Sequence, residues 1–424
     1  MTHHRPAPLT HLALGALLLL ATPWLAGPAA EDSGPPGPRI VAVGDIHGDA
    51  DAFRAILHRA GIVDDAGRWS GGQAILVQTG DFTDRGAQVR EVMDYMLALE
   101  PQARAAGGRL EVLIGNHEAL NLIGELRDVN PEVYSRFAGP ESEQRRRAAY
   151  EAYVALAKVR AADVTAAGDR QLPVPAVYTP AAREEWMAAH PPGLIEYLDA
   201  FGPAGTYGTW LRARPAALAI DGTVFVHGGF NPEVAPRTVG EVTEQVQREI
   251  RRFDDARAEL VSRKAAQPFY VFQEILEASR FTVQVALVNA AAGDAVTMPR
   301  GLQPLEELGR IGTWWLINPN GPLWFRGFAT WTSTDGSPRI DELATRYDAK
   351  RFVVGHTMPA SMRITPRFAR RVFIIDTGML SSYYKGGRPS ALEIDGDQVT
   401  AVYLDSRQVL AGPGAPPAPA APPQ

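Results

Sequence analysis

The sequence predicts an α/β fold, because short apolar runs that end on polar residues alternate with segments of helical periodicity. The first run, Ile40–Val43, is rich in β-branched residues and ends at Gly44, directly before Asp45. Two further runs end in the same way, at Asp81 and at Asn116, after intervals of 36 and 35 residues. A βαβ unit needs about 30 residues or more for a helical crossover and a parallel return. Parallel strands joined by helices are therefore expected.

Side chains that follow the carboxyl ends of neighbouring parallel strands converge on one crevice. The polar residues at these strand ends are Asp45, His47, Asp81, Asn116 and His117. The strand pattern returns at residues 223–226 and 351–354, and each of these runs leads into a histidine, His227 and His356. We expect the residues at these strand ends to form one site.

Carboxylate, amide and imidazole groups together suit Mn²⁺, Fe or Zn²⁺, whereas Ca²⁺ prefers oxygen ligands alone. A single histidine at such a place is usually only a packed core residue, but seven candidates together indicate a metal site. Seven candidate ligands are more than one ion requires, so the simplest arrangement is two ions that share Asp81 as a ligand. Two ions about 3.5–4 Å apart activate water and hold phosphate oxygens in phosphoester hydrolysis.

The segments between these motifs have helical periodicity. Residues 51–60 and 89–99 predict amphipathic helices that cover the strands. Two long charged stretches, at about 125–215 and 235–318, predict helical insertions. His58 and His190 lie outside the strand-end pattern, and we expect no role in the site for either. Residues 391–404 predict a terminal β-hairpin with its turn at Asp395-Gly396.

The two ends of the chain differ in composition from the rest. Residues 1–30 predict a signal peptide, since a weakly basic start precedes the apolar run Leu12–Leu25 and small residues follow. An uncleaved N-terminal anchor is the alternative. We assign residues 31–38 to a linker, 39–405 to the catalytic domain and 406–424 to a disordered tail rich in Pro and Ala. A periplasmic or secreted protein without a stable membrane span after cleavage is the expectation.

The overall composition excludes some function classes. The chain contains no cysteine, so it has neither disulfides nor thiol chemistry. Its formal net charge is −6, and we expect no nucleic-acid partner, since such proteins normally carry a basic surface. The oligomeric state is not indicated by the sequence.

The motifs resemble those of the calcineurin-like metallophosphoesterase superfamily. They are Gly44-Asp45-Ile46-His47-Gly48, Gly80-Asp81 with Asp84-Arg85-Gly86, Gly115-Asn116-His117-Glu118, His227-Gly228-Gly229 and Gly355-His356. The Asp-Arg-Gly and Asn-His-Glu forms are those of its phosphoprotein phosphatase branch, and the whole is most similar to bacterial Shewanella-like protein phosphatases. The resemblance covers about 40–128, 224–230, 322–327 and 352–404, and it leaves the insertions out.

This resemblance implies a fold and a set of roles. The fold is a sandwich of two mixed β-sheets flanked by helices. Two divalent or transition metal ions are implied, Mn foremost, with Fe or Zn as alternatives. Asp45 and His47 would bind the first ion and Asp81 would bridge the two; the second would be bound by Asn116, His227 and His356. The catalytic residues would be His117, which protonates the leaving alcohol, and Asp84, which orients it. Phosphate would be bound by Arg85, Arg326 and Asn116.

Some positions depart from the family pattern or remain open. Position 358 is Met358, where many distant members have a second histidine ligand. Arg326 is matched by its Pro-Leu-Trp-Phe-Arg-Gly context and not by spacing. Arg127 either reaches the substrate or is a solvated charge, and Asp376 is either a partner of the ligands or only structural. Tyr383 and Tyr384 are possible pocket residues.

Three functions compete at this point. The first is an exported phosphatase that uses two metal ions and an activated water to hydrolyse phosphorylated protein side chains. The second has the same chemistry on small phosphoesters such as dinucleoside polyphosphates. The third is a metal- or phosphate-binding module without catalysis, which the presence of His117, Asp84 and Arg85 disfavours. The core motifs do not distinguish the first two.

Overall fold

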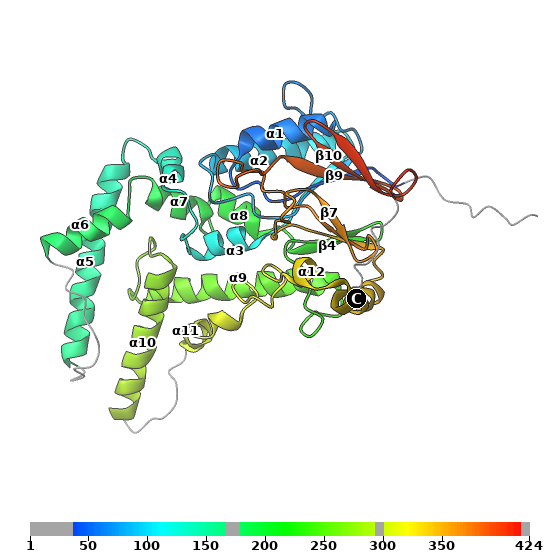
Figure 1. Ribbon diagram of the computed structural model, residues 1–424. Coiled ribbons are helices and arrows are strands. Elements are labelled where there is room, and N and C mark those ends of the chain that lie inside the picture. Colours follow the sequence, from blue (N-terminus) through cyan, green and yellow to red (C-terminus); the bar gives the residue numbers. More distant parts are fainter. Residues whose placement is uncertain (1–36, 167–178, 293–300, 417–424) are drawn as a thin grey trace, which may run out of the picture. The chain divides into compact units, whose positions relative to one another are not determined.

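The computed structural model describes residues 37–166, 179–292 and 301–416 (Figure 1). The predicted signal peptide, most of the predicted linker and residues 417–424 lie outside the described residues. The description below therefore concerns the predicted catalytic domain and the residues that directly follow it.

Three parallel strands hold the first group of motifs. β1 (Ile40–Val43) pairs in parallel with β2 (Ile75–Gln78), which pairs in parallel with β3 (Arg109–Val112). The crossovers contain α1 (Ala50–Arg59) and α2 (Val89–Ala105). The βαβ units predicted from the spacing of the motifs are confirmed.

The end of the chain completes this sheet on the other side of β1. The predicted hairpin is confirmed as β9 (Ser390–Asp395) and β10 (Gln398–Tyr403), and β9 pairs antiparallel with β1. The expected disordered tail, however, does not begin at residue 406. Residues Arg407–Ala411 form β11, which pairs antiparallel with β10, and Leu410 is buried. A Pro/Ala-rich composition applies only to the residues that follow this strand.

A second mixed sheet has the strand order β4-β5-β6-β8-β7. Its strands β5, β6 and β8 are parallel, and β4 and β7 pair antiparallel at the two edges. The bounds are Ala217–Ile220 for β4, Thr223–Val226 for β5, Arg351–Val354 for β6, Thr365–Arg367 for β7 and Val372–Ile374 for β8. The two mixed sheets implied by the family resemblance are confirmed.

The two sheets pack face to face. Ile40 and Ala42 of β1 share a buried apolar cluster with Phe225 and Val353 of the second sheet. The alternate residue Val41 belongs to the other cluster, which contains the apolar faces of α1 and α2. Because β1 is buried on both faces, its sequence is a continuous apolar run and not an alternating one. This packing fixes the carboxyl ends of the strands from both sheets at one edge.

The two stretches expected to be insertions are helical, and we find no strand among their described residues. The stretch 125–215 holds α4 (Pro131–Phe137), α5 (Ser142–Ala166), α6 (Pro180–Ala189), α7 (Leu194–Phe201) and α8 (Thr206–Arg212). The stretch 235–318 holds α9 (Val239–Ser262), α10 (Phe272–Ala292), α11 (Gln303–Leu308) and a 3₁₀ turn at Ile311–Thr313. Among the described residues, no helix combines the length and the apolar character that crossing a bilayer requires.

Three more helices accompany the core motifs: α3 (Asn116–Ile123), α12 (Gly327–Thr330) and α13 (Ser333–Arg346). The two histidines with no expected role lie away from these motifs. His58 is exposed and pairs with Asp65 at 2.9 Å. His190 follows α6, and its ring stacks on Trp186 with 3.8 Å between the ring centroids.

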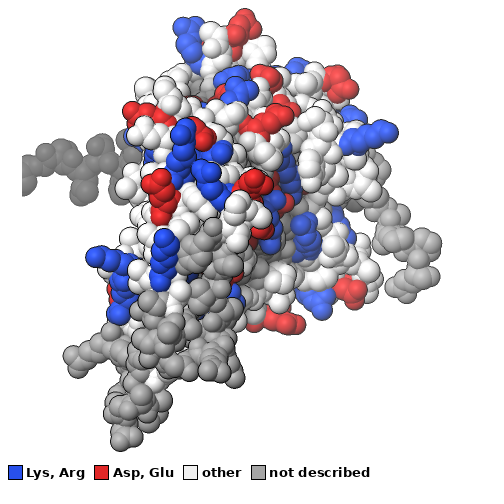
Figure 2. Space-filling view, turned by 90° about the vertical axis from the view of Figure 1, so that its left-hand side faces the viewer, with Lys and Arg blue, Asp and Glu red and all other residues white. Residues whose placement is uncertain are grey.

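Figure 2 shows one face of the molecule on which Lys and Arg side chains are interspersed with Asp and Glu side chains. The described part of this face therefore lacks the single-sign basic field that is typical of nucleic-acid-binding surfaces.

Candidate active site

The loops that follow five strands bring the candidate residues together. Asp45 and His47 follow β1, Asp81 follows β2, and Asn116 and His117 begin α3 after β3. The second sheet contributes His227 after β5 and His356 after β6. Each of these side chains is buried. The metal ligands and the catalytic residues expected from the sequence all lie in this cluster. The two arginines expected to bind phosphate, Arg85 and Arg326, are described below.

The backbone of these loops is strained in an unusual way. Five site residues have φ in the left-handed region: His47 at 48°, Asp81 at 58°, Asp84 at 66°, Arg85 at 64° and His356 at 65°. This region is costly for residues other than glycine, and its use at one place indicates a functional constraint. Neighbouring loops hold it, since the backbone N–H groups of Ile46 and His47 both donate to the carbonyl of Asp81.

Four ligand-type atoms surround one point at the base of the cluster. Nε2 of His227 lies 3.1 Å from Oδ2 of Asp81, 3.0 Å from Oδ1 of Asn116 and 3.2 Å from Nδ1 of His356. Ligands that each lie about 2.0–2.2 Å from a shared ion are separated from one another by roughly these distances. These four residues fit the second metal site that the resemblance implies.

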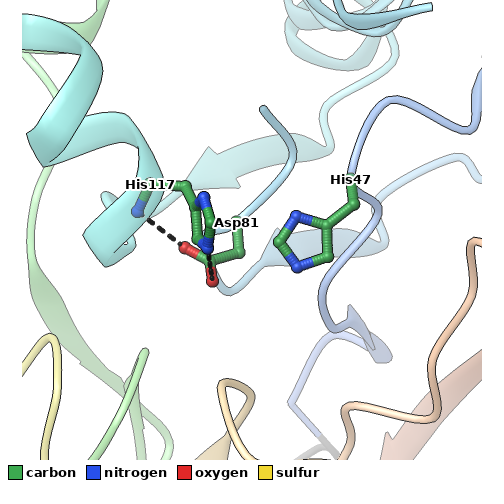
Figure 3. A group of neighbouring side chains, drawn as sticks. All are labelled: His47, Asp81 and His117. Atoms are coloured by element: carbon green, nitrogen blue, oxygen red, sulfur yellow. Dashed lines mark hydrogen bonds and ion pairs between the residues drawn. The ribbon is translucent and has the colours of Figure 1, made fainter. Parts of the chain in front are cut away.

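A second group lies on the other side of Asp81. The ligand atoms of His47, Asp81 and His117 all lie within 4.8 Å of one another, and Oδ2 of Asp45 lies 3.8 Å from Nε2 of His47. In the view of Figure 3 the ring of His117 overlaps the Asp81 carboxylate, which accepts the backbone N–H of His117 at 3.0 Å, and the rings of His47 and His117 contact each other edge-on with 4.8 Å between their centroids. Proximity alone does not decide whether His117 is a ligand here.

The hydrogen bonds of the four histidines separate His117 from the others. Three rings each donate one N–H to a backbone carbonyl, which leaves the other nitrogen free to bind a metal, as in many metal sites. These bonds run from Nδ1 of His47 to Thr83, from Nδ1 of His227 to Thr79 and from Nε2 of His356 to Trp324, each at 3.0 Å. Nδ1 of His117 instead lies 2.7 Å from the carboxylate of Asp84. A carboxylate partner favours the charged imidazolium, which is suited to proton donation.

The buried charges of the cluster fit cations. Burial, together with the negative charges of Asp376 and Asp81, raises the pKa of Asp45 well above its ordinary value. Burial lowers the pKa of His47 and of His356 well below the ordinary value, so both rings are neutral. Burial opposes protonation of His227 too, but the charge of Asp81 outweighs it and raises the pKa to about 9. Buried carboxylates beside the neutral imidazole nitrogens of His47 and His356 are a donor set for divalent ions, and a bound cation would replace the proton of His227.

Burial also opposes the charged form of His117, but the negative charge of Asp81 and the hydrogen bond to Asp84 raise its pKa above the ordinary value. Nη2 of Arg85 lies 3.0 Å from Nε2 of His117, and the same guanidinium contacts Nε2 of His47 and the hydroxyl of Tyr384. A substrate phosphate placed among these groups would meet an arginine and a proton donor together.

A cavity of about 270 Å³ opens above the cluster. Arg326 lies in its wall, where Nη1 donates to the carbonyl of His356 at 2.9 Å and to the hydroxyl of Thr357 at 3.0 Å. The open candidates Arg127, Asp376 and Tyr384 line the cavity as well, together with Asp81, Arg85, Asn116, His117, Asp128, Trp324, His356 and Met358. Tyr383 does not line this cavity; it is exposed and its ring faces the guanidinium of Arg85.

Two residues with structural roles at the site were not assigned them from the sequence. Glu118 belongs to the Asn-His-Glu motif, and its buried carboxylate accepts hydrogen bonds from the backbone N–H groups of residues 81–83. Its position three residues after Gly115 is that of a helix capping box, which was a usable signal. Asn121 donates to Asp84 at 2.8 Å, and nothing in its sequence context indicated this.

Residues 38–159 match the family model for calcineurin-like phosphoesterases. Shewanella-like protein phosphatase 1 of Plasmodium berghei (strain Anka) is 22% identical over 369 residues, which cover 86% of this chain and 74% of the relative. Shewanella-like protein phosphatase 2 of Arabidopsis thaliana is 37% identical over 99 residues, 23% of this chain and 25% of the relative. The chain therefore contains a calcineurin-like metallophosphoesterase domain and is a metal-dependent phosphatase, and most of its length is similar to a protein named Shewanella-like protein phosphatase 1.

Solved structures show a similar fold. A cold-active protein tyrosine phosphatase has a TM-score of 0.51 at 22% identity, and the match covers 88% of this chain and 78% of the other. A cold-active protein-tyrosine phosphatase structure from a psychrophilic Shewanella species has a TM-score of 0.50, also at 22% identity, with 88% and 80% covered. These matches confirm the mixed α/β architecture.

Proposed function

We propose that this calcineurin-like metallophosphoesterase hydrolyses phosphomonoesters of protein side chains with the help of two metal ions. The main support for this proposal is that residues of the ligand cluster around Asp81 line the same cavity as His117, Arg85 and Arg326, and His117 is paired with Asp84. Ions held by Asp45, His47, Asp81, Asn116, His227 and His356 would supply Lewis-acid activation of water and neutralise phosphate charge.

The side chains of the protein divide the remaining work. Arg85 and Arg326 bind phosphate oxygens, for which their planar guanidinium groups are suited. Nε2 of His117 donates its proton to the leaving-group oxygen as the bond from phosphorus to that oxygen breaks. Asp84 holds Nδ1 of His117 and stabilises the imidazolium before the transfer.

The choice of a protein substrate is supported by the rim of the cavity and by the relatives. Trp324 and Arg127 lie at the wall, and the exposed ring of Tyr383 stands beside Arg85. These side chains offer contacts to groups that flank a phosphorylated residue. The relatives named above are protein phosphatases by name.

Small phosphoesters with a further phosphate are the second candidate, since Arg127 adds a third arginine to the cavity.

Export is part of the same proposal. It is supported by the apolar run Leu12–Leu25 between a weakly basic start and small residues, a pattern typical of signal peptides. N-terminal sequencing of the mature protein and fractionation of the producing cells test it. A full-length protein that stays in the cytoplasmic fraction would overturn it.

The function is tested on purified protein that is first chelated and then supplied with Mn²⁺, Fe²⁺ or Zn²⁺. We expect close to two ions per chain by elemental analysis and the highest turnover with Mn²⁺. Phosphotyrosine peptide, phosphoserine peptide and dinucleoside tetraphosphate are compared at equal concentration, and a phosphopeptide is expected to give the highest kcat/KM. A clear preference for the dinucleotide would favour the second candidate, and one ion per chain would refute the shared-ligand arrangement.

A further inference from the structure

A buried series of hydrogen bonds connects the first helical insertion to the His117–Asp84 pair. Oδ1 of Asp84 accepts from Nδ2 of Asn121 at 2.8 Å, and Oδ1 of Asn121 accepts from the hydroxyl of Tyr197. Tyr197 lies on α7, 76 residues beyond Asn121 in the chain. Tyr197, Asn121 and Asp84 are each no more than 2% exposed, so water does not substitute for these bonds.

The direction of each bond follows from the chemistry of the groups. Nδ2 of Asn121 donates to Asp84 and also to the backbone carbonyl of His117 at 2.9 Å, so both amide hydrogens are used. The amide oxygen therefore faces the tyrosine hydroxyl, which donates to it. If the amide were turned over, its oxygen would face the carboxylate of Asp84, which has no hydrogen to donate when ionised. The carboxylate of Asp84 and the carbonyl of His117 thus set the orientation of the amide, and the hydroxyl of Tyr197 supplies the donor for its oxygen.

Packing fixes the position of that hydroxyl. The ring of Tyr197 stacks on Phe201 with 4.4 Å between centroids and contacts Phe137 edge-on at 5.0 Å. Burial and the nearby charge of Asp84 raise the pKa of Tyr197 well above its ordinary value, so the hydroxyl keeps its proton and remains a donor. The insertion therefore presents a rigid donor to the core.

We propose that Tyr197 is a positioning residue for proton transfer by His117, acting through Asn121 and Asp84. With Oδ1 of Asp84 held by the amide, Oδ2 stays aligned on Nδ1 of His117 at 2.7 Å, and His117 lines the cavity. The inference rests on the proposed phosphomonoester hydrolysis, and it assigns a positioning role to a helix outside the motifs that carry the family resemblance.

The test uses Tyr197→Phe, which removes the hydroxyl and keeps the ring. Tyr207→Phe is the matched control, because Tyr207 is also buried and contacts the same Phe137 and Phe201, but its hydroxyl donates to Asp94 and not toward the site. Each variant is assayed on a phosphoserine peptide, whose alkoxide leaving group needs a proton, and on 2,4-dinitrophenyl phosphate, whose leaving group does not.

We expect Tyr197→Phe to lower kcat on the phosphoserine peptide by about tenfold and to change KM by less than about twofold. A tenfold loss is part of the general-acid contribution, which is about 10²–10⁴-fold in total. Turnover of 2,4-dinitrophenyl phosphate should change by no more than about twofold. Tyr207→Phe should leave the ratio of the two activities unchanged. Equal losses on both substrates, unchanged activity on both, or the same change of ratio in Tyr207→Phe would each overturn the proposal.

Asn121→Ala is a second variant that breaks the same series of hydrogen bonds, and it replaces Tyr197→Phe in the test if that variant does not fold. The two substitutions together also give a double-mutant cycle. Because Tyr197 acts through Asn121, adding Tyr197→Phe to Asn121→Ala should produce no further loss on the phosphoserine peptide. An additive loss would refute the pathway through the amide.

A readout that is independent of turnover separates this inference from the proposed function. The proton between Nδ1 of His117 and Asp84 should give a low-field NMR resonance in the wild-type protein. We expect it to move or broaden in Tyr197→Phe and to stay in place in Tyr207→Phe, at metal contents equal to wild type. If the wild-type protein hydrolyses no phosphomonoester, the proposed function fails, while this resonance still decides whether Tyr197 positions the pair.

Discussion

Oε2 of Glu118 accepts a hydrogen bond from the backbone N–H of Asp81 at 2.7 Å, and Asp81 is the residue that both halves of the ligand cluster share. The same carboxylate also accepts the N–H groups of Phe82, Thr83 and Gly115 and the hydroxyl of Thr83. An ionised carboxylate only accepts, on about four lone-pair sites, so the five donors share its two oxygens. Glu118 therefore holds Asp81 in its left-handed conformation.

Glu118→Gln tests this support. The amide of Gln would direct hydrogens at backbone N–H groups, and each buried donor left without an acceptor costs about 1–3 kcal/mol. We expect the free energy of unfolding of the metal-free protein to fall by about 2–4 kcal/mol in urea denaturation. Metal affinity should fall as well. Glu125→Gln, two residues beyond the end of the same helix, is the control, with an expected change within about 0.5 kcal/mol. Wild-type stability and affinity in Glu118→Gln would refute this role.

His117→Ala decides between proton donor and metal ligand. As a donor, its loss should reduce turnover of a phosphoserine peptide by about 10²–10⁴-fold with both ions retained. As a ligand, which the 3.8 Å between its Nε2 and Oδ2 of Asp81 would allow, its loss should release an ion. Elemental analysis distinguishes the two outcomes, with His47→Ala as the control that should lose one. Asp84→Asn should give a smaller loss of turnover at full metal content.

The convergence of the strand-end residues was predictable because it depends on local chain geometry. A helical crossover of fixed length brings Asp45, Asp81 and Asn116 to one edge of parallel strands, and the sequence spacing contains that length. The second sheet was expected only through the family resemblance. Its strands are separated by a long helical stretch, and spacing alone does not specify which of them pair.

The supporting residues were not predictable in the same way. Glu118 and Asn121 act through hydrogen bonds whose partners depend on the shape of the loops, and Tyr197 comes from an insertion without a recognisable motif. β11 (Arg407–Ala411) was not expected because the residues that follow it are rich in Pro and Ala, and the whole tail was assigned from that composition. One buried leucine and a tight return after β10 are enough to form this edge strand.

Arg127 provides a test of substrate preference. Its guanidinium lies 6.0 Å from the centroid of the Trp324 ring, and its nearest acidic partner is Asp128 at 3.6 Å. Because Arg85 and Arg326 are the residues proposed to bind the phosphate, we expect Arg127 to attract a second negative group on the substrate. Arg127→Gln should reduce the preference for a phosphopeptide with an acidic neighbour over one with a neutral neighbour by about three- to fivefold.

The comparison of kcat/KM for the two peptides checks this expectation. The preference in the wild-type protein should weaken at high salt, since an exposed charge pair is screened. Arg104→Gln, an exposed arginine of α2 that does not line the cavity, is the control for the loss of one positive charge and should keep the preference. A wild-type protein that turns over both peptides equally would remove Arg127 from substrate selection.

Glu274 predicts a pH dependence of stability that is unrelated to the active site. Its Oε2 accepts the backbone N–H of Val271 at 2.9 Å, and burial raises its pKa from 4.5 to about 7. A carboxyl group whose pKa is raised in the folded state binds protons more tightly there than in the unfolded chain. At pH 4 Glu274 is protonated in both states and does not change the free energy of unfolding. As pH rises through about 4.5–7, ionisation of Glu274 increasingly destabilises the folded state.

Glu274→Gln keeps an acceptor for Val271 and removes the buried charge. At pH 8 the variant should be more stable than wild type by about 3 kcal/mol, since each pKa unit corresponds to about 1.4 kcal/mol, and at pH 4 the two should be nearly equal. Urea denaturation at both pH values measures the difference, with Glu306→Gln at an exposed position of α11 as the control. An equal difference at the two pH values would mean that ionisation of Glu274 does not limit the stability of this helix.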